Sequence, residues 1–147
     1  MLDAHLDAHE VAPRLWQGSR PKPDELHGVD LLVLAAEEYQ PARCCFPAHL
    51  KIVRAAIPDE RFTGTEDELA LVGNAVDEVV RAHRSGKTVL VTCWAGLNRS
   101  GLIVGLALRQ LYGLSGAEAT KTVRRARPLA LFNEFFVQII ETGVLPY

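Results

Sequence analysis

The residues of this chain that could do chemistry together lie in one short stretch, VTCWAGLNRSG, at positions 91 to 101. Five residues separate Cys93 from Arg99, which is enough for the backbone to curl so that successive N–H groups face one concavity. Such a concavity binds anions, and the planar fork of Arg99 can hold two oxygens of a tetrahedral oxyanion. The same positive field favours the thiolate of Cys93 over the thiol. The stretch therefore predicts an anion-binding loop with a poised nucleophile.

Each of these residues also has an ordinary structural interpretation. Cys93 alone could be a buried cysteine, Arg99 a solvated residue in the first turn of a helix, and Gly96 a plain turn glycine. Together they favour function, because burying a thiol beside an arginine at a helix amino terminus serves packing poorly.

The elements around the stretch place it at a strand-to-helix junction. An apolar strand is expected at 88–92, before the stretch, and a mostly buried helix follows, closed by Gly113. Other apolar runs predict strands at 15–19, 30–36 and 51–57, and further helices are expected after the Thr65 and Ser115 capping boxes and over 131–142. Strands that alternate with helices indicate an α/β fold with a central, mainly parallel sheet of four to five strands flanked by helices. Residues 1–12 are assigned to an N-terminal extension and residues 13–147 to a single domain.

The segment from Cys93 to Gly101 resembles the C-x5-R-[ST] loop of the cysteine-dependent protein tyrosine phosphatase superfamily, and most closely its dual-specificity group. The resemblance extends to LWQGS at 15–19 and to RRARPLALFNEFFVQ at 124–138. It implies a protein tyrosine phosphatase-like three-layer sandwich. It also implies phosphomonoester hydrolysis through a phosphocysteine intermediate, in a protein tyrosine or dual-specificity phosphatase.

The resemblance carries specific roles onto this chain. Cys93 would be the nucleophile, and Asp59, just past a predicted strand, would be the general acid. Asp59 could instead shape a turn after Pro58, and Glu60 is a rival acid. Ser100 would donate its hydroxyl to the thiolate, or simply cap the helix. Asn133 would brace the phosphate loop, or be a surface helix residue.

The loop is expected to bind the phosphoryl group through six residues: Trp94, Ala95, Gly96, Leu97, Asn98 and Arg99. Thr92 replaces the histidine that the family usually places before the cysteine, although its hydroxyl could compensate in part. The loop has no lysine, which disfavours a lipid headgroup as substrate. Trp94 and Phe62 could line an entrance that suits an aromatic ring, or belong to the core.

Composition restricts the partners. The 147 residues carry a formal net charge of −2 with no long basic stretch, so we expect no nucleic-acid partner. No run approaches the roughly 20 apolar residues of a membrane span, so we expect no membrane partner. Phosphorylated proteins or peptides are the expected substrates, and phosphate, vanadate or sulfate the expected inhibitors. We expect a monomer. We also expect no metal or cofactor, since His5 and His9 lie in a terminal segment, where metal binding is disfavoured.

Three cysteines, of which Cys44 and Cys45 are adjacent, make a poor disulfide framework and favour the reducing cytoplasm. We expect Cys44 and Cys45 to be buried structural residues rather than partners of an oxidised Cys93.

Two other functions stay open. A rhodanese-like sulfurtransferase also uses a cysteine in an anion-binding loop, and a catalytically weak phosphate-binding module would bind the anion without turnover.

Overall fold

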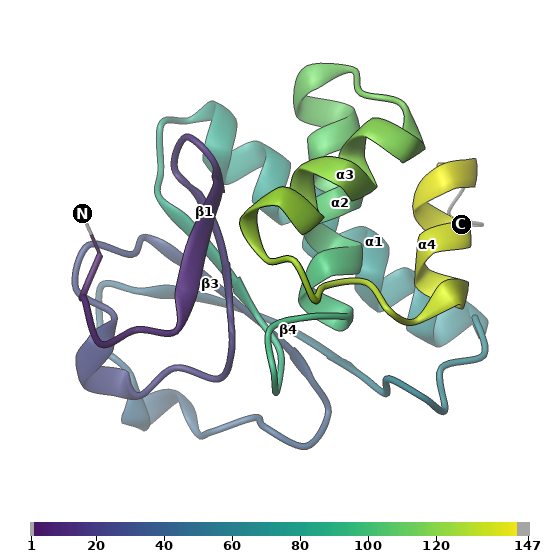
Figure 1. Ribbon diagram of the computed structural model, residues 1–147. Coiled ribbons are helices and arrows are strands. Elements are labelled where there is room, and N and C mark those ends of the chain that lie inside the picture. Colours follow the sequence, from purple (N-terminus) through teal and green to yellow (C-terminus); the bar gives the residue numbers. More distant parts are fainter. Residues whose placement is uncertain (1, 144–147) are drawn as a thin grey trace.

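A computed structural model describes residues 2–143 of the chain, and its centre is a five-stranded sheet with the strand order β1-β2-β5-β3-β4 (Figure 1). The inner pairs are parallel, and only β1 runs antiparallel to its neighbour at one edge. The strands are β1 (Ala8–Ala12), β2 (Leu15–Gly18), β3 (Leu31–Ala36), β4 (Lys51–Ile57) and β5 (Val89–Thr92). The mainly parallel sheet predicted from the sequence is confirmed.

Parallel strands bring their carboxyl ends to one edge of the sheet. Strands β2, β3, β4 and β5 end there at Gly18, Ala36, Ile57 and Thr92. Segments far apart in the chain therefore meet beyond this edge, which is where open α/β sheets place their ligands.

Four α-helices pack together on one side of the sheet (Figure 1). They are α1 (Glu66–Arg84), α2 (Arg99–Tyr112), α3 (Gly116–Ala126) and α4 (Glu134–Thr142). The Thr65 and Ser115 capping boxes are confirmed at the starts of α1 and α3. The last helix begins at Glu134 rather than at 131, because Leu131 has a positive φ of 62° and Asn133 caps the helix through its side chain.

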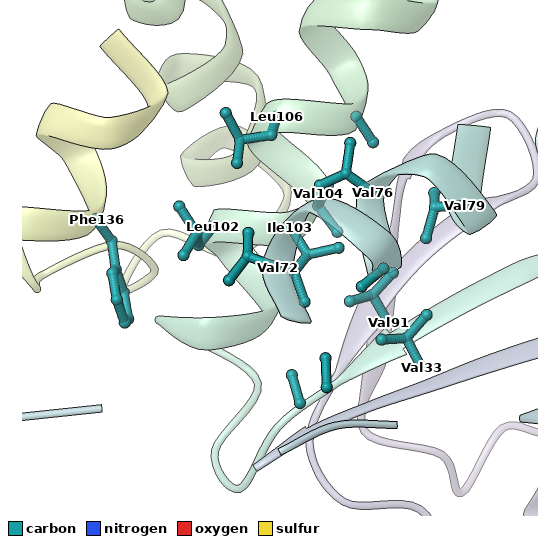
Figure 2. Close-up of a cluster of buried hydrophobic side chains, with 14 of the residues drawn as sticks. Val33, Val72, Val76, Val79, Val91, Leu102, Ile103, Val104, Leu106 and Phe136 are labelled. Atoms are coloured by element: carbon teal, nitrogen blue, oxygen red, sulfur yellow. The ribbon is translucent and has the colours of Figure 1, made fainter. Parts of the chain in front are cut away.

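Alternation along the strands divides the core into two layers. Figure 2 shows the first layer, where Val33 and Val91 of the sheet lie close to helix residues such as Val72 and Ile103. The intervening strand residues, including Leu34, face the other side and pack against the N-terminal segment and two short 3-10 helices, Pro23–Glu25 and Arg43–Cys45. Burial on both faces explains why the inner strands are almost wholly apolar.

Two cysteines depart from expectation. Cys44 and Cys45 were predicted to be buried, but both are exposed in the 3-10 helix Arg43–Cys45. This short helix covers the sheet through its neighbours Phe46 and Leu50, which leaves the two thiols on the outside. Within the described part of the chain, no helix has both the length and the hydropathy to cross a membrane.

Candidate active site

A cavity of about 250 Å³ lies beyond the carboxyl edge of the sheet. The loop between β5 and α2 forms its base with Cys93 and Arg99, and Asp59 joins the lining from the end of β4. The rim carries two aromatic side chains, Trp94 and Phe132, which are exposed. Cys93 itself is only 4% exposed, so the thiol lies at the bottom of the cavity.

The loop is held open by hydrogen bonds to four consecutive carbonyl groups. Arg20 donates to the Trp94 carbonyl from its backbone N–H (3.3 Å) and from Nη1 (3.0 Å). Arg127 Nη2 donates to the Ala95 carbonyl (3.1 Å), and Gln17 Nε2 donates to the Gly96 carbonyl (3.1 Å). The Leu97 carbonyl accepts the backbone N–H of Leu131 (3.2 Å). All four carbonyls therefore point away from the cavity.

A trans peptide fixes the next N–H opposite to each carbonyl. The N–H groups of residues 95 to 98 consequently face inward, which makes a concave set of donors suited to an anion. Gly96 is required for this curl, since its φ is +73° and an added Cβ would lie 2.4 Å from the Gly18 carbonyl carbon. The conformation expected from the sequence is thus present.

Helix α2 adds its positive end to the same site. Its N-cap residue Asn98 makes no side-chain cap, so the Asn98 side chain does not occupy the N–H groups of the first turn. Cys93 Sγ lies 3.3 Å from the buried hydroxyl of Ser100 in that turn. The sulfur thus has a hydroxyl partner and lies at the start of a helix.

Arg99 is oriented by a carboxylate that the sequence analysis did not single out. Its Nη1 and Nη2 atoms donate to the two oxygens of Glu38 at 2.5 and 2.8 Å, and Nη1 also donates to the Ile57 carbonyl (3.1 Å). Burial acts to lower the pKa of Arg99, but the bonds to Glu38 and the negative charges of Cys93 and Glu38 outweigh it and raise the pKa. The hydrogen bond from Arg99 in turn lowers the pKa of Glu38.

Asp59 is clamped by two amide side chains. Asn98 Nδ2 lies 3.0 Å from Oδ2 and 3.3 Å from Oδ1 of its carboxylate, and Asn133 Nδ2 donates to Oδ1 at 3.0 Å. The backbone N–H of Asn133 donates to Asn98 Oδ1 (3.1 Å), which joins the two amides. Asn133 thereby touches both Asp59 and a loop residue. The rival acid Glu60 also lines the cavity, but its carboxylate accepts no hydrogen bond from either amide among residues 2–143.

Two expected contributors lie elsewhere. The Thr92 hydroxyl donates to the Val33 carbonyl of β3 (2.8 Å), so it is directed into the sheet and does not compensate for a missing histidine beside Cys93. Phe62 is buried against Phe135 and Phe136, with ring centroids 5.8 and 4.9 Å away, and belongs to the core. Of the two aromatic residues considered for the entrance, Trp94 alone lines the cavity.

Four residues of the site were missed by sequence reasoning: Glu38, Gln17, Arg20 and Arg127. Gln17 and Arg127 are polar and buried, and each has one side-chain atom without a hydrogen-bond partner among the described residues. A glutamine inside the apolar strand at 15–19 was the available signal, because a buried amide needs a partner. Residues 2–143 contain no group of three or more His, Cys, Asp or Glu side chains placed to hold a metal ion.

A loop with outward carbonyls, a buried cysteine at its start and an arginine at its end defines the class of cysteine-dependent phosphatase folds. Residues 16–144 match the family described as dual specificity phosphatase, catalytic domain, and the chain belongs to this family. The Arabidopsis thaliana protein named Dual specificity protein phosphatase 1 is 33% identical over 100 residues, which are 65% of this chain and 48% of that protein. The chain therefore spans about half the length of that curated relative.

Solved structures agree with this assignment. Human DUSP28 superposes with a TM-score of 0.78 at 27% identity, covering 97% of this chain and 96% of that one. A mouse protein assigned to the dual specificity phosphatases, in complex with zinc tungstate, superposes with a TM-score of 0.79 at 25% identity, covering 95% and 87%.

Proposed function

We propose that this protein hydrolyses phosphomonoesters on protein side chains through a phosphocysteine intermediate. The observation that carries the proposal is the loop of inward N–H groups that surrounds a buried cysteine and ends in an oriented arginine. Preorganised donors of this kind stabilise the charge of a phosphoryl group during transfer without having to reorient.

In the first step, the Cys93 thiolate attacks phosphorus while the bond to the leaving oxygen breaks. The inward N–H groups and Arg99 hold the three oxygens that become equatorial. Asp59 gives its proton to the leaving oxygen, from the opposite wall of the cavity. The products of this step are an alcohol or phenol and a phosphocysteine.

In the second step, water attacks the phosphocysteine and the sulfur leaves as a thiolate. Asp59, now ionised, takes the proton of that water. Ser100 lies 3.3 Å from the sulfur, where its hydroxyl can donate to the thiolate that is released. Phosphate then leaves, and the enzyme returns to its starting state.

The substrate class follows from the family and from the mouth of the cavity. Trp94 and Phe132 give it aromatic walls, which suit a phosphotyrosine ring, while the absence of lysine from the loop argues against a polyphosphorylated headgroup. Tetrahedral oxyanions such as phosphate, vanadate or sulfate should compete for the loop, and the tungstate complex of the mouse relative supports this.

We place the protein in a reducing, cytoplasmic environment because Cys44 and Cys45 are exposed free thiols.

The test is hydrolysis of aryl phosphate and phosphotyrosine peptide, without added metal, by wild type, Cys93→Ser and Asp59→Asn from about pH 4.5 to about pH 8. We expect no turnover with Cys93→Ser and a loss of about 100-fold or more with Asp59→Asn on the acidic side. Trapping of a phosphorylated Cys93 during turnover would identify the intermediate.

Other outcomes would assign a different function. A sulfurtransferase has no use for Asp59, so thiosulfate-dependent turnover that is insensitive to Asp59→Asn would replace the proposal. Binding of vanadate, lost with Arg99→Ala, in a wild-type protein that never turns over would instead indicate a phosphate-binding module.

A further inference from the structure

A second hollow, of about 680 Å³, shares Trp94 and Ala95 with the lining of the catalytic cavity. It is lined by the segment that follows β2, including Ser19, Arg20 and Lys22, and by Tyr39 beyond β3. Because both hollows border Trp94, the second hollow lies within reach of a polypeptide whose phosphorylated side chain enters the cavity. Nothing in the proposed reaction uses it.

Arg20 is fixed at this place by Trp94. Its guanidinium carbon lies 3.7 Å from the centroid of the Trp94 ring, and Nη1 donates to the Trp94 carbonyl. Tyr39 packs edge-on against the same ring at 6.5 Å, which stiffens the arrangement. A guanidinium has five N–H donors, and only one of them has a protein partner among residues 2–143. Arg20 therefore presents an oriented cation with free donors.

The charges around the hollow leave an excess of positive charge. Asp7 is paired with Arg127, and that hydrogen bond holds the pKa of Asp7 below its usual range, so the pair is neutral as a unit. Glu25 accepts the backbone N–H of Lys22. Neither Arg20 nor Lys22 forms an ion pair within the described residues, so two cations face one remaining carboxylate.

A third hollow, which shares Glu38, Asp59, Glu60 and Arg99 with the catalytic cavity, has the reverse character. Two of its four carboxylates are paired, Glu37 with Arg61 and Glu38 with Arg99, which leaves Asp59 and Glu60 without an ion pair among the described residues. An acidic side chain of a substrate would be repelled at that hollow and attracted beside Arg20. The charge difference between the two hollows thus favours acidic substrates. It also favours the binding direction that places the acidic side chain beside Arg20.

We propose that the hollow around Arg20 and Lys22 is a second anion-binding subsite. It takes the carboxylate or phosphate of a side chain within about three residues of the phosphorylated residue of a substrate polypeptide. This proposal extends the proposed function, because it predicts that acidic or multiply phosphorylated segments are the preferred substrates. The role of the subsite in turnover rests on that function.

The test compares phosphotyrosine peptides of equal length that carry glutamate, phosphoserine or glutamine at each flanking position. The measured quantity is the ratio of kcat/KM for an acidic peptide to that for the glutamine peptide, which cancels general changes in activity. We expect wild type to prefer an acidic peptide about threefold to fivefold, and the preference to fall with added salt. Lys22→Gln and Arg20→Gln should each reduce the ratio toward one.

Lys87→Gln is the matched control. Lys87 is also an exposed lysine, but it precedes β5, at the end of the sheet away from the loop. Its substitution by glutamine therefore removes the same charge as Lys22→Gln without changing the hollow. A wild-type ratio of one at every position, or a ratio that Lys22→Gln and Arg20→Gln leave unchanged, would overturn the subsite. The glutamate and phosphoserine arms show which anion the subsite prefers.

Binding to the Cys93→Ser variant, followed by fluorescence anisotropy of the same labelled peptides, keeps this test independent of turnover. If wild type hydrolyses none of the peptides, the proposed function fails, whereas a binding preference that Lys22→Gln removes would still establish the subsite. If instead the variants weaken binding to phosphatidylserine vesicles and no peptide preference exists, the hollow binds an anionic surface and the peptide assignment is wrong.

Discussion

Glu38 and Arg99 form a bidentate ion pair beside the reactive cysteine. Nη1 of the guanidinium donates to one carboxylate oxygen of Glu38, and Nη2 donates to the other. The second hydrogen of Nη1 is taken by the Ile57 carbonyl. Of the five N–H donors of Arg99, this leaves one on Nη2 and one on Nε, and Nε is buried with no partner in the described part of the chain. These two donors lie on the same edge, parallel to each other, as bidentate binding of a phosphoryl group requires.

Glu38→Gln should therefore weaken substrate turnover, because the guanidinium loses the charged partner that orients its free edge. We expect kcat/KM for an aryl phosphate to fall about tenfold, and the inhibition constant of phosphate to rise with it. Glu37→Gln is the matched control, since Glu37 pairs with the exposed Arg61 instead. If Glu38→Gln binds phosphate more tightly than wild type, Glu38 competes with the substrate and does not orient Arg99.

Asn133→Ser separates the two tasks of Asn133. Serine keeps a cap on α4 but is too short to reach Asp59, so the stability should hold while the general acid loses one of its amide partners. We expect kcat/KM to fall about tenfold for phenyl phosphate, whose leaving group needs a proton, and to change little for p-nitrophenyl phosphate. Equal losses on both substrates would mean that Asn133 acts on the loop rather than on Asp59.

Gly96→Ala should abolish the anion site. The substitution combines a strained φ of +73° with a Cβ placed 2.4 Å from the backbone of Gly18, so the inward N–H groups cannot keep their positions. We expect kcat/KM and vanadate affinity to fall by about 100-fold or more. Gly86→Ala is the control, because Gly86 has a φ of +81° and open space around it. That variant should lose about 1–2 kcal/mol of stability and keep its activity.

The sequence predicted the local parts of this site well and its long-range parts poorly. The loop itself, the strand before it and the capping boxes depend on residues close in the chain, and each lies where expected. The donors that hold the loop open come from far away, since Arg20 and Gln17 precede their acceptors by 74 and 79 residues. Glu38 reaches Arg99 across 61 residues, because β3 lies next to β5 in the sheet.

The edge of the sheet was missed for a related reason. Residues 8–12 form β1, whose side chains are exposed or half-buried, so no apolar run marked it as a strand. Pairing with β2 and the Asp7–Arg127 ion pair place this segment against the fold, and neither partner is local. Asp7 is thereby joined to the phosphate loop through Arg127, which also donates to the Ala95 carbonyl.

Thr92→Val tests whether the residue before the cysteine acts structurally. Because the Thr92 hydroxyl is buried and donates to the Val33 carbonyl, we expect a loss of about 1–2 kcal/mol in the free energy of unfolding. Activity at a temperature where the variant is folded should stay within about twofold of wild type, and Thr92→Ser should restore the stability. A loss of activity without a loss of stability would instead place the hydroxyl in the chemistry at Cys93.

Asp7→Asn should change the pH dependence of stability. Since Arg127 lowers the pKa of Asp7 in the folded protein, the carboxylate stabilises the fold above its unfolded pKa of about 3.9, and this contribution is lost as the pH falls through the lower folded value. At neutral pH the variant should be less stable by about 0.2–1 kcal/mol, a small value because the Asp7 side chain is 59% exposed. Denaturant unfolding at about pH 6 and at successively lower pH should show the two proteins converging below about pH 3.9. Asp77→Asn, an exposed change on α1, is the control, and a difference between Asp7→Asn and wild type that persists unchanged into acid would show that Asp7 acts through its shape rather than its charge.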